Sequence, residues 1–213
     1  LTVKSVLEAM IKAHELQGRL GADFALTEHG IDHVFLTKIA CAAVVAKLLG
    51  GSHQQIVNAI SLAFFDVSLC VHRYDTNTGP RKGWGGADAS SHAVRLALMA
   101  LKNEPGYPQV FSHPKFGFAK SFLGGDSPLR AVAFESSVME HVFFKLAGPV
   151  VIHAQSAIEC ALQLHPQVKT RLAEIASIEI ATHKTTIRNI SKTGPLRNSA
   201  DRDHCLQYAI AVA

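Results

Sequence analysis

The fold is decided by the stretch Leu36-Thr-Lys-Ile-Ala-Cys-Ala-Ala-Val-Val-Ala-Lys-Leu-Leu-Gly-Gly-Ser-His-Gln-Gln55. Residues 36–49 are dense in alanine and valine, which favours a helix packed closely against other helices. Gly50 and Gly51 can adopt the positive φ that closes a helix. Ser52 with Gln55 is a capping-box pattern, and we expect it to open a helix that runs to about residue 69.

The same helical spacing of apolar residues recurs on both sides of this stretch. It predicts helices over residues 3–20, 88–102, 130–147 and 150–164, the last with Pro149 in a favourable first turn. The polar, glycine-rich residues 72–86 and the proline-rich residues 105–128 are expected to be loops, the latter with short elements at most. The sequence therefore predicts a mainly α protein.

The pattern changes in Ile175-Ala-Ser-Ile-Glu-Ile-Ala-Thr-His183, where alternation and β-branching predict a strand. We therefore expect a multi-helix domain over residues 1–170, followed by the start of an α+β domain over residues 171–213. The sequence begins without Met and stops at Ala213 inside an apolar run. We accordingly expect an interior piece of a longer protein.

Composition narrows the function classes. Hydrophobic residues make up 48% and charged residues 18% of the chain, which is typical of a packed soluble protein. The net charge of +4 is spread along the chain, which argues against nucleic acid and fits a small anionic substrate. No apolar run approaches the ~20 residues of a membrane span, and no signal-peptide pattern is present. We expect a soluble intracellular protein without a membrane partner.

The cysteines show neither CxxC pairs nor a zinc or iron–sulfur spacing. They are Cys41, Cys70, Cys160 and Cys205. Each lies in an apolar helical pattern, so we expect reduced core residues rather than disulfides, and no metal site.

Three basic residues surround a glycine-rich helix entry: Arg73, Arg81 and Lys82. Guanidinium groups beside backbone N–H groups at a helix start make a good carboxylate site. The segment is neither a Walker A loop nor a dinucleotide-binding fingerprint. The alternative is a solvated loop whose glycines only let the chain turn.

Two further places offer imidazole or amine groups near helix ends. His33 follows Asp32 just before a helix, so it could be a general base held in one tautomer. More often, such a pair is a helix cap together with a buried histidine. Lys145, which we expect to be partly buried at a helix end, and His153 flank Pro149. They could bind an anion, or they could serve only the helix terminus and packing.

The last candidate group is Arg202, His204 and Tyr208. The histidine and the tyrosine are four residues apart, which on one helix face would let them deliver and accept protons, although ordinary packing produces such stripes too. Taken together, the four places suit acid–base chemistry on a small acidic molecule without a metal.

At these places the chain resembles the MmgE/PrpD family. The segments that carry the resemblance are Val6-Leu-Glu-Ala-Met-Ile-Lys-Ala-His-Glu-Leu-Gln-Gly18, Gly30-Ile-Asp-His-Val34, Asn77-Thr-Gly-Pro-Arg-Lys-Gly-Trp84, Ser91-His-Ala-Val-Arg-Leu-Ala97, His153-Ala-Gln155 and Ala200-Asp-Arg-Asp-His-Cys-Leu-Gln-Tyr208. They follow the family order across nearly the whole chain.

The resemblance implies an all-helical domain with an α+β lid, usually as a homodimer, in the cytoplasm or the mitochondrial matrix. It implies a cofactor-free lyase that dehydrates 2-methylcitrate, a tricarboxylate, to 2-methyl-cis-aconitate in propionate breakdown. His33 would be the base and Tyr208 or His153 the acid. The substrate-facing cations would include Arg81, Lys82 and Lys145.

The chain departs from the family pattern at two places. Gly148-Pro-Val-Val-Ile-His153 lacks the usual acidic residue, and Gly85-Gly-Ala-Asp88 replaces the more usual Ala-Ala-Gly-Asp. Another family activity, such as cis-aconitate decarboxylation, and an inactive interaction module are the competing interpretations.

Overall fold

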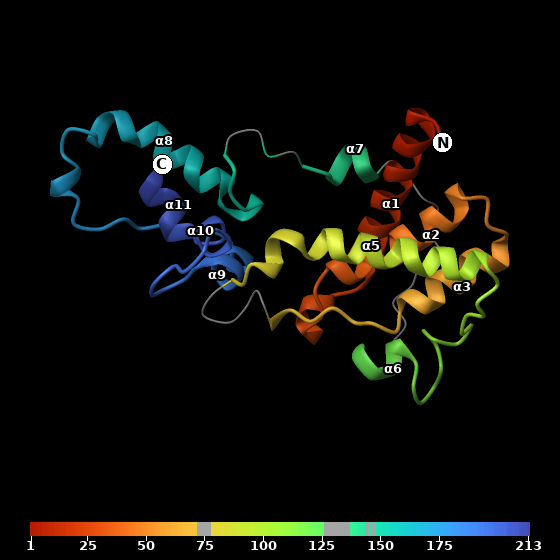
Figure 1. Ribbon diagram of the computed structural model, residues 1–213. Helices are drawn as coiled ribbons and strands as arrows, with labels where there is room; N and C mark the ends of the chain where they lie inside the picture. Colours follow the sequence, from red (N-terminus) through yellow and green to blue (C-terminus); the bar gives the residue numbers. More distant parts are fainter. Residues whose placement is uncertain (72–77, 126–136, 144, 146–147) are drawn as a thin grey trace. The chain divides into compact units, whose positions relative to one another are not determined.

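The computed structural model describes residues 1–71, 78–125, 137–143, 145 and 148–213. Within these residues the regular structure is helical and no β-strand is present (Figure 1), so the predicted mainly α class is confirmed. Contacts divide the chain into two compact units. The first unit comprises Leu1–Cys70 and Trp84–Val142, and the second comprises Val71–Gly83 and Phe143–Ala213.

The predicted helices at the start of the first unit are confirmed. Helix α1 spans Val3–Asp23 and is closed at its start by a capping box on Thr2. Helix α2 spans Val34–Leu48, and Gly50 follows it with a φ of 86°. A short 3-10 turn, η1 (Leu26–His29), lies between α1 and α2, which pack against each other. Local capping signals thus determine where these elements begin and end.

Helix α3 spans His53–Ala63 and opens with the predicted capping box on Ser52. The expectation that it continues to residue 69 is wrong. The backbone of residues 68–70 is needed elsewhere, since Asp32 N donates to Ser68 O at 2.7 Å and Cys70 N donates to Gly30 O at 2.9 Å. This tertiary pairing outcompetes the weaker helical preference of the segment.

Helix α5 spans Arg81–Leu101, so the predicted loop over residues 72–86 is wrong from Arg81 onward, and residues 72–77 lie outside the described residues. Pro80 precedes the first turn, where its fixed φ suits a helix start. Gly83, Gly85 and Gly86 lie in the helix, although each glycine costs about 1 kcal/mol relative to alanine there. The three glycines favoured a loop in the sequence because each of them weakens a helix. The contacts that offset this cost in the folded chain are not visible in the sequence.

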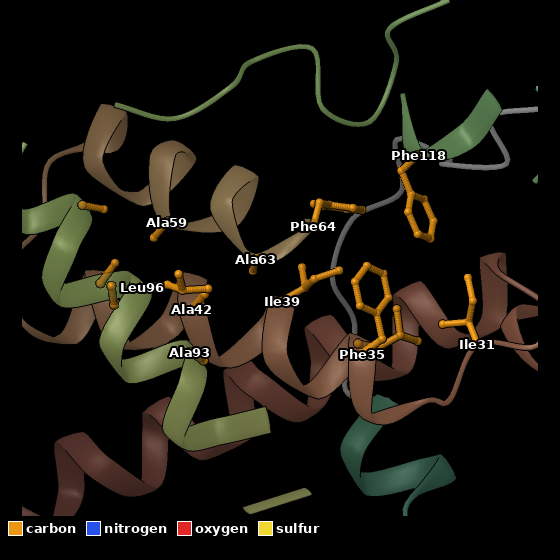
Figure 2. Close-up of a cluster of buried hydrophobic side chains, with 14 of the residues drawn as sticks. Ile31, Phe35, Ile39, Ala42, Ala59, Ala63, Phe64, Ala93, Leu96 and Phe118 are labelled. Atoms are coloured by element: carbon orange, nitrogen blue, oxygen red, sulfur yellow. The ribbon is translucent and has the colours of Figure 1, made fainter. Parts of the chain in front are cut away.

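The core of the first unit combines small residues with stacked aromatic rings (Figure 2). Ala93, Ala97 and Ala100 are buried alanines of α5, and they belong to the same cluster as alanines of α2 and α3. Around Phe35 the rings of Phe64, Phe111 and Phe118 complete the cluster, and the centroids of Phe35 and Phe118 are 5.1 Å apart. The expectation of close packing through small side chains is therefore confirmed.

Short helices end the first unit. Helix α6 spans Phe118–Phe122, in agreement with the expected loop with short elements. Helix α7 spans Ser137–His141. Most of the helix predicted over residues 130–147 lies outside the described residues, but residues 142, 143 and 145 are not helical, so its predicted end is wrong.

The second unit is built from short helices around a small apolar cluster. Its elements are η2 (Ile152–Ala154), α8 (Gln155–Val168), η3 (Leu172–Glu174), α9 (Lys184–Ile190), α10 (Ser199–Asp203) and α11 (Leu206–Val212). The buried members of the cluster are Ala154, Ile158, Ile190, Leu206 and Ala209. The helix predicted over residues 150–164 is present as η2 followed by α8.

The strand predicted over residues 175–183 is wrong. This segment has no regular structure, and Ile178 is 59% exposed. A strand needs a partner for its backbone N–H and C=O groups, and the described residues pair none with it. The predicted domain boundary is a single point near residue 170. The two compact units are defined by contacts and each combines two separate stretches of chain, so they do not test this boundary, which stays a prediction.

Two general expectations can be compared with the fold. None of the four cysteines, all of which lie in the described residues, forms a disulfide. Cys70 and Cys205 are buried as predicted, but Cys160 on α8 is exposed, which corrects that interpretation. Across the described part of the chain, no helix has the length and apolarity required to span a bilayer.

Candidate functional site

A basic turn, defined here as residues 78–82, brings Arg81 and Lys82 to the start of α5. Lys82 N donates to Gly79 O at 3.1 Å, and Gly83 N donates to Pro80 O at 3.0 Å, so the turn passes directly into the helix. Both basic side chains are half-buried. Arg73, the third predicted cation, lies outside the described residues.

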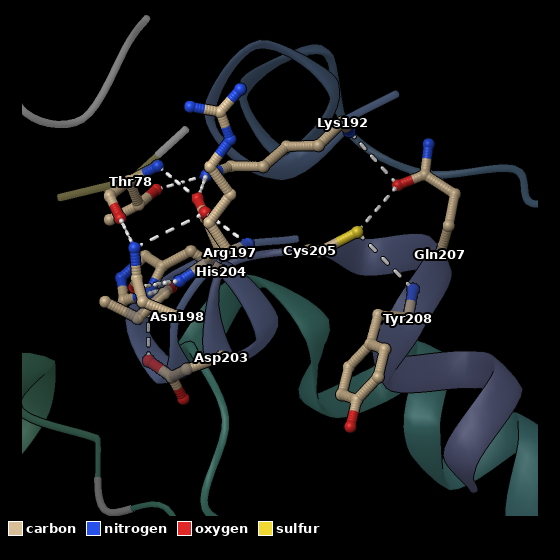
Figure 3. A network of polar contacts seen from close by, with 11 residues as sticks. Thr78, Lys192, Arg197, Asn198, Asp203, His204, Cys205, Gln207 and Tyr208 are labelled. Atoms are coloured by element: carbon tan, nitrogen blue, oxygen red, sulfur yellow. Dashed lines mark hydrogen bonds and ion pairs between the residues drawn. The ribbon is translucent and has the colours of Figure 1, made fainter. Parts of the chain in front are cut away.

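A buried carboxylate on α10 holds the basic turn. It belongs to the polar network of Thr78, Lys192 and Asn198 that Figure 3 shows. Asp201 is fully buried and accepts hydrogen bonds from Thr78 N, from Lys192 Nζ at 3.2 Å and from Arg197 N at 3.1 Å. Burial alone would raise the pKa of Asp201. The hydrogen bonds from Arg197, Lys192 and Thr78 and the charge of Lys192 outweigh burial, so this pKa lies below its usual range.

Thr78 is held through all three of its polar atoms. Its N–H donates to Asp201, its hydroxyl accepts from Lys192 Nζ, and its carbonyl accepts from Asn198 Nδ2 at 3.1 Å. Asn198 also caps α10, because its Oδ1 accepts from Asp201 N at 3.0 Å. The basic turn is therefore tied to the chain just before α10.

The prediction that His204 and Tyr208 share one helix face is wrong. His204 ends α10 and Tyr208 lies on α11, with Cys205 in an extended conformation between the two helices. Cys205 Sγ accepts from Tyr208 N at 3.5 Å and so caps α11. Cys205 therefore begins a new helix instead of extending α10.

The side chains of this segment differ in exposure. His204 Nδ1 lies 2.8 Å from Asp203 Oδ2 and 3.2 Å from Ala200 O, two acceptors that favour the proton on Nδ1. Arg202 is exposed, and Tyr208 is 39% exposed. All three predicted residues belong to the second unit. His204 is the least exposed of them.

The remaining predicted residues of the second unit flank its first helices. His153 lies in η2, half-buried, with Asn189 Nδ2 at 3.5 Å from its Nε2. Lys145 is exposed and lies outside any helix, so its predicted place at a helix end, partly buried, is wrong. The helix before it ends at His141, which leaves Lys145 in irregular chain.

His33 is the one predicted residue that belongs to the first unit. Its Nδ1 lies 3.0 Å from Asp32 Oδ1, and its side chain is 47% exposed. Asp32 is buried and also accepts from Val34 N at 3.2 Å, in the first turn of α2. The Asp–His pair at a helix start is therefore confirmed, whereas the alternative of a buried histidine is not.

The first unit also contains a polar cluster that the sequence analysis missed. Lys38 is 2% exposed, donates to the backbone carbonyl of Asp66, and has a pKa lowered to about 8 by burial, against a smaller opposite effect of Asp66. His92 Nε2 lies 3.4 Å from Asp66 Oδ2. Burial, together with Lys38 and Arg95, lowers the pKa of His92. The available signal was Lys38 in the middle of a helix whose neighbouring positions are mostly apolar.

His92 also lines a shallow cavity of about 160 Å³ on α5. Its other lining residues are Asp88, Ser91 and Arg95, so both signs of charge meet there. Within the described residues no three His, Cys, Asp or Glu side chains are grouped so that they could hold a metal ion.

Comparison with known proteins identifies the family. The MmgE/PrpD N-terminal domain matches residues 2–130, and the MmgE/PrpD C-terminal domain matches residues 149–213. The 2-methylcitrate dehydratase of Escherichia coli K12 is 46% identical over 216 residues, which cover 100% of this chain and 45% of that protein.

Relatives from other organisms give the same result. The 2-methylcitrate dehydratase of Cupriavidus necator is 45% identical, covering 100% of this chain and 45% of that protein. The mitochondrial 2-methylcitrate dehydratase of Yarrowia lipolytica is 46% identical, covering 99% of this chain and 41% of that protein. The chain thus spans less than half the length of these relatives. With both domain types matched in order along its residues, the chain belongs to the MmgE/PrpD family.

Proposed function

We propose that this chain supplies part of the active site of a hydro-lyase that converts 2-methylcitrate to 2-methyl-cis-aconitate and water. The observation that carries the proposal is the 46% identity to a 2-methylcitrate dehydratase over the whole chain. The second unit contains cations, imidazoles and a phenol among its described residues, which suits the same reaction class.

The reaction removes a proton from the carbon next to a carboxylate and expels a hydroxide from the neighbouring carbon. It needs a base, an acid that turns the hydroxide into water, and cations on the carboxylates. The electron pair of the broken C–H bond forms the second bond of the C=C, and the electron pair of the broken C–O bond leaves with the hydroxide. The base keeps the proton taken from carbon, and the acid protonates the hydroxide to water. Atoms and electrons balance without any further reactant.

His33 is assigned as the base. Its contact with buried Asp32, 3.0 Å from Nδ1, supports a tautomer with the proton on Nδ1 and Nε2 as acceptor. The exposure of the ring keeps it accessible to a substrate. Asp32 would then stabilise the imidazolium that forms when the proton is taken.

The acid is assigned to Tyr208 or His153, both in the second unit. Arg81, Lys82 and Lys145 would bind the carboxylates and stabilise the enolate-like charge that develops. Arg73, Arg202 and His204 complete the proposed substrate-binding set, which suits a small tricarboxylate. No cofactor enters the proposed steps.

The surroundings of the enzyme follow from the same proposal. A homodimer, a role in propionate catabolism, and a place in the cytoplasm or the mitochondrial matrix are all proposed. The relative from Yarrowia lipolytica is named as mitochondrial, which supports the second compartment for a eukaryotic source.

The activity is tested on the full-length gene product. We expect 2-methylcitrate to give a rising ultraviolet absorbance from the conjugated product, with citrate and cis-aconitate supplied in parallel. Release of CO₂ from cis-aconitate would instead identify a decarboxylase. Absence of turnover with all three would contradict the proposal and favour an interaction module.

The base assignment is tested separately. His33→Ala should lower turnover by about 10²–10⁴-fold, the usual contribution of a positioned general base. His29→Ala is the matched control, since it removes an exposed histidine a few residues away. Turnover of His33→Ala within a few-fold of wild type would refute the assignment.

A further inference from the structure

We propose that Asp201 is a positioning residue, which holds Thr78 and thereby fixes the basic turn of residues 78–82. This inference rests on the proposed function, because it assumes that the turn presents cations to substrate carboxylates. It assigns a role to the buried Asp201 carboxylate, which takes no part in the proposed elimination.

The first step of the argument is how completely Thr78 is held. Thr78 is 1% exposed, and its N–H, hydroxyl and carbonyl all have partners near α10. Two of these partners, Asp201 and Lys192, also bond each other at 3.2 Å, and their side chains are 0% and 7% exposed. Water therefore competes little for these hydrogen bonds, which strengthens them.

The second step concerns the helix start that directly follows the basic turn. Arg81 and Lys82 begin α5, whose next residues include Gly83, Gly85 and Gly86. A Cβ added at any of these glycines would meet nothing within 4 Å, so packing does not require glycine there. Because glycine weakens a helix, the first turns of α5 gain little stability of their own. The anchor at Thr78 therefore adds a buried fixed point just before a helix start of low intrinsic stability.

The third step is that one carboxylate serves two candidate segments. Asp201 lies in α10, which continues into Arg202 and His204, while its oxygens hold the basic turn. Loss of its charge would loosen the turn and leave the Lys192 ammonium enclosed without its counter-ion. Asp201 touches none of the reacting atoms in the proposed mechanism, so its effect passes through the cations.

The test uses the full-length protein and propane-1,2,3-tricarboxylate, which lacks the hydroxyl that the reaction expels and therefore binds without turnover. Asp201→Asn removes the charge, and Thr78→Val removes only the hydroxyl that accepts from Lys192. Thr185→Val is the matched control, an exposed β-branched position on α9. The readouts are the Kd of the tricarboxylate by calorimetry, kcat and KM, and the folded fraction by circular dichroism.

We expect both variants to raise the Kd and KM about tenfold or more, as the loss of well-placed contacts to a charged group does. The effect on kcat should be smaller, and Thr185→Val should match wild type. A purely structural role would lower the active fraction and kcat but leave the Kd of the folded molecules unchanged. If Asp201→Asn does not fold, Thr78→Val alone decides.

A double variant tests whether the effect passes through the cations. Thr78→Val combined with Arg81→Gln should bind the tricarboxylate no more weakly than Arg81→Gln alone, because the anchor then has less to position. Strictly additive effects, or a Kd of Thr78→Val within twofold of wild type, would overturn the inference.

The two proposals fail in different ways. Wild-type protein that binds the tricarboxylate but does not dehydrate 2-methylcitrate would contradict the proposed function, and the Kd of the variants would still decide the role of Asp201. Wild-type protein that dehydrates 2-methylcitrate while Asp201→Asn and Thr78→Val keep its Kd would contradict only the positioning role. Wild-type protein that binds no tricarboxylate would contradict the positioning role directly.

Discussion

Replacing Lys38 with methionine should change how the stability of the first unit depends on pH. Lys38 is buried in α2, its ammonium group donates to the carbonyl of Asp66, and it lies 5.3 Å from the centroid of the Phe35 ring. Burial lowers its pKa from 10.5 to about 8. Methionine keeps the apolar length of the side chain and removes the charge.

The sign follows from proton binding in the two states. Between pH 8 and pH 10.5 the unfolded chain keeps a proton on this lysine while the folded chain releases it, so stability rises with pH in that window. One pKa unit corresponds to about 1.4 kcal/mol, which gives about 3 kcal/mol across the whole window. Solvent reaches the Asp66 carboxylate, which is 65% exposed, and screens charges near the site. We therefore expect the free energy of unfolding to change by about 1–3 kcal/mol. Below pH 8 this contribution should be constant.

The assay is urea unfolding followed by the fluorescence of Trp84, which lies on α5 in the first unit and is the single tryptophan of these residues. The free energy of unfolding is measured for wild type and Lys38→Met at intervals from pH 7 to pH 10. Lys47→Met, which removes an exposed lysine from the same helix, is the control.

The expected result is a difference between wild type and Lys38→Met that shifts in favour of wild type as the pH rises above 8. A difference that stays flat up to pH 10 would refute the reasoning, because Lys38 would then titrate alike in the folded and unfolded states. A shift of the same size in Lys47→Met would refute it as well.

Three other substitutions or reactions test the structure. Phe35→Ala should lower the free energy of unfolding by about 3–5 kcal/mol in a urea titration, because Phe35 is fully buried and stacks on Phe118 at 5.1 Å; a loss below about 1 kcal/mol would contradict its central place. Gly106→Ala should lower the melting temperature in calorimetry, since a Cβ there would lie 2.6 Å from Asn58 Cα; an unchanged melting temperature would contradict this close approach. Cys160 should react first with a thiol reagent in the folded protein because it is exposed, and Cys160→Ser should remove the fast phase of the reaction; a fast phase that persists would show that another cysteine is accessible.

Features with a local signature were predictable from the sequence. The capping box on Ser52 and the positive φ of Gly50 depend on residues within one turn, and the structure contains both of them. The predicted boundaries failed where distant residues decide. Helix α3 stops at Ala63 because the following chain pairs with residues 30–32, and no nearby residue reveals that pairing.

The candidate site follows the same rule. The pairing of Asp32 with His33 could be predicted because the two residues are adjacent. The contact between Thr78 and Asp201 could not, since 123 positions separate them. His204 and Tyr208 have helical spacing, yet Cys205 breaks the helix between them by capping the next one. Residue spacing alone does not reveal where one helix ends and a second helix begins.

The hydrogen bonds around Asp201 also set which positions can vary during evolution. Its partners at residues 78 and 197 donate through the main chain, so for these bonds any residue other than proline would serve. Asn198, Lys192 and Asp201 contribute side chains, and their chemical identity is therefore constrained. Drift at residue 197 should be nearly free, whereas an acceptable change at Lys192 or Asp201 would require a compensating change in the other. Related sequences that differ at one of these two residues should therefore differ at the other as well.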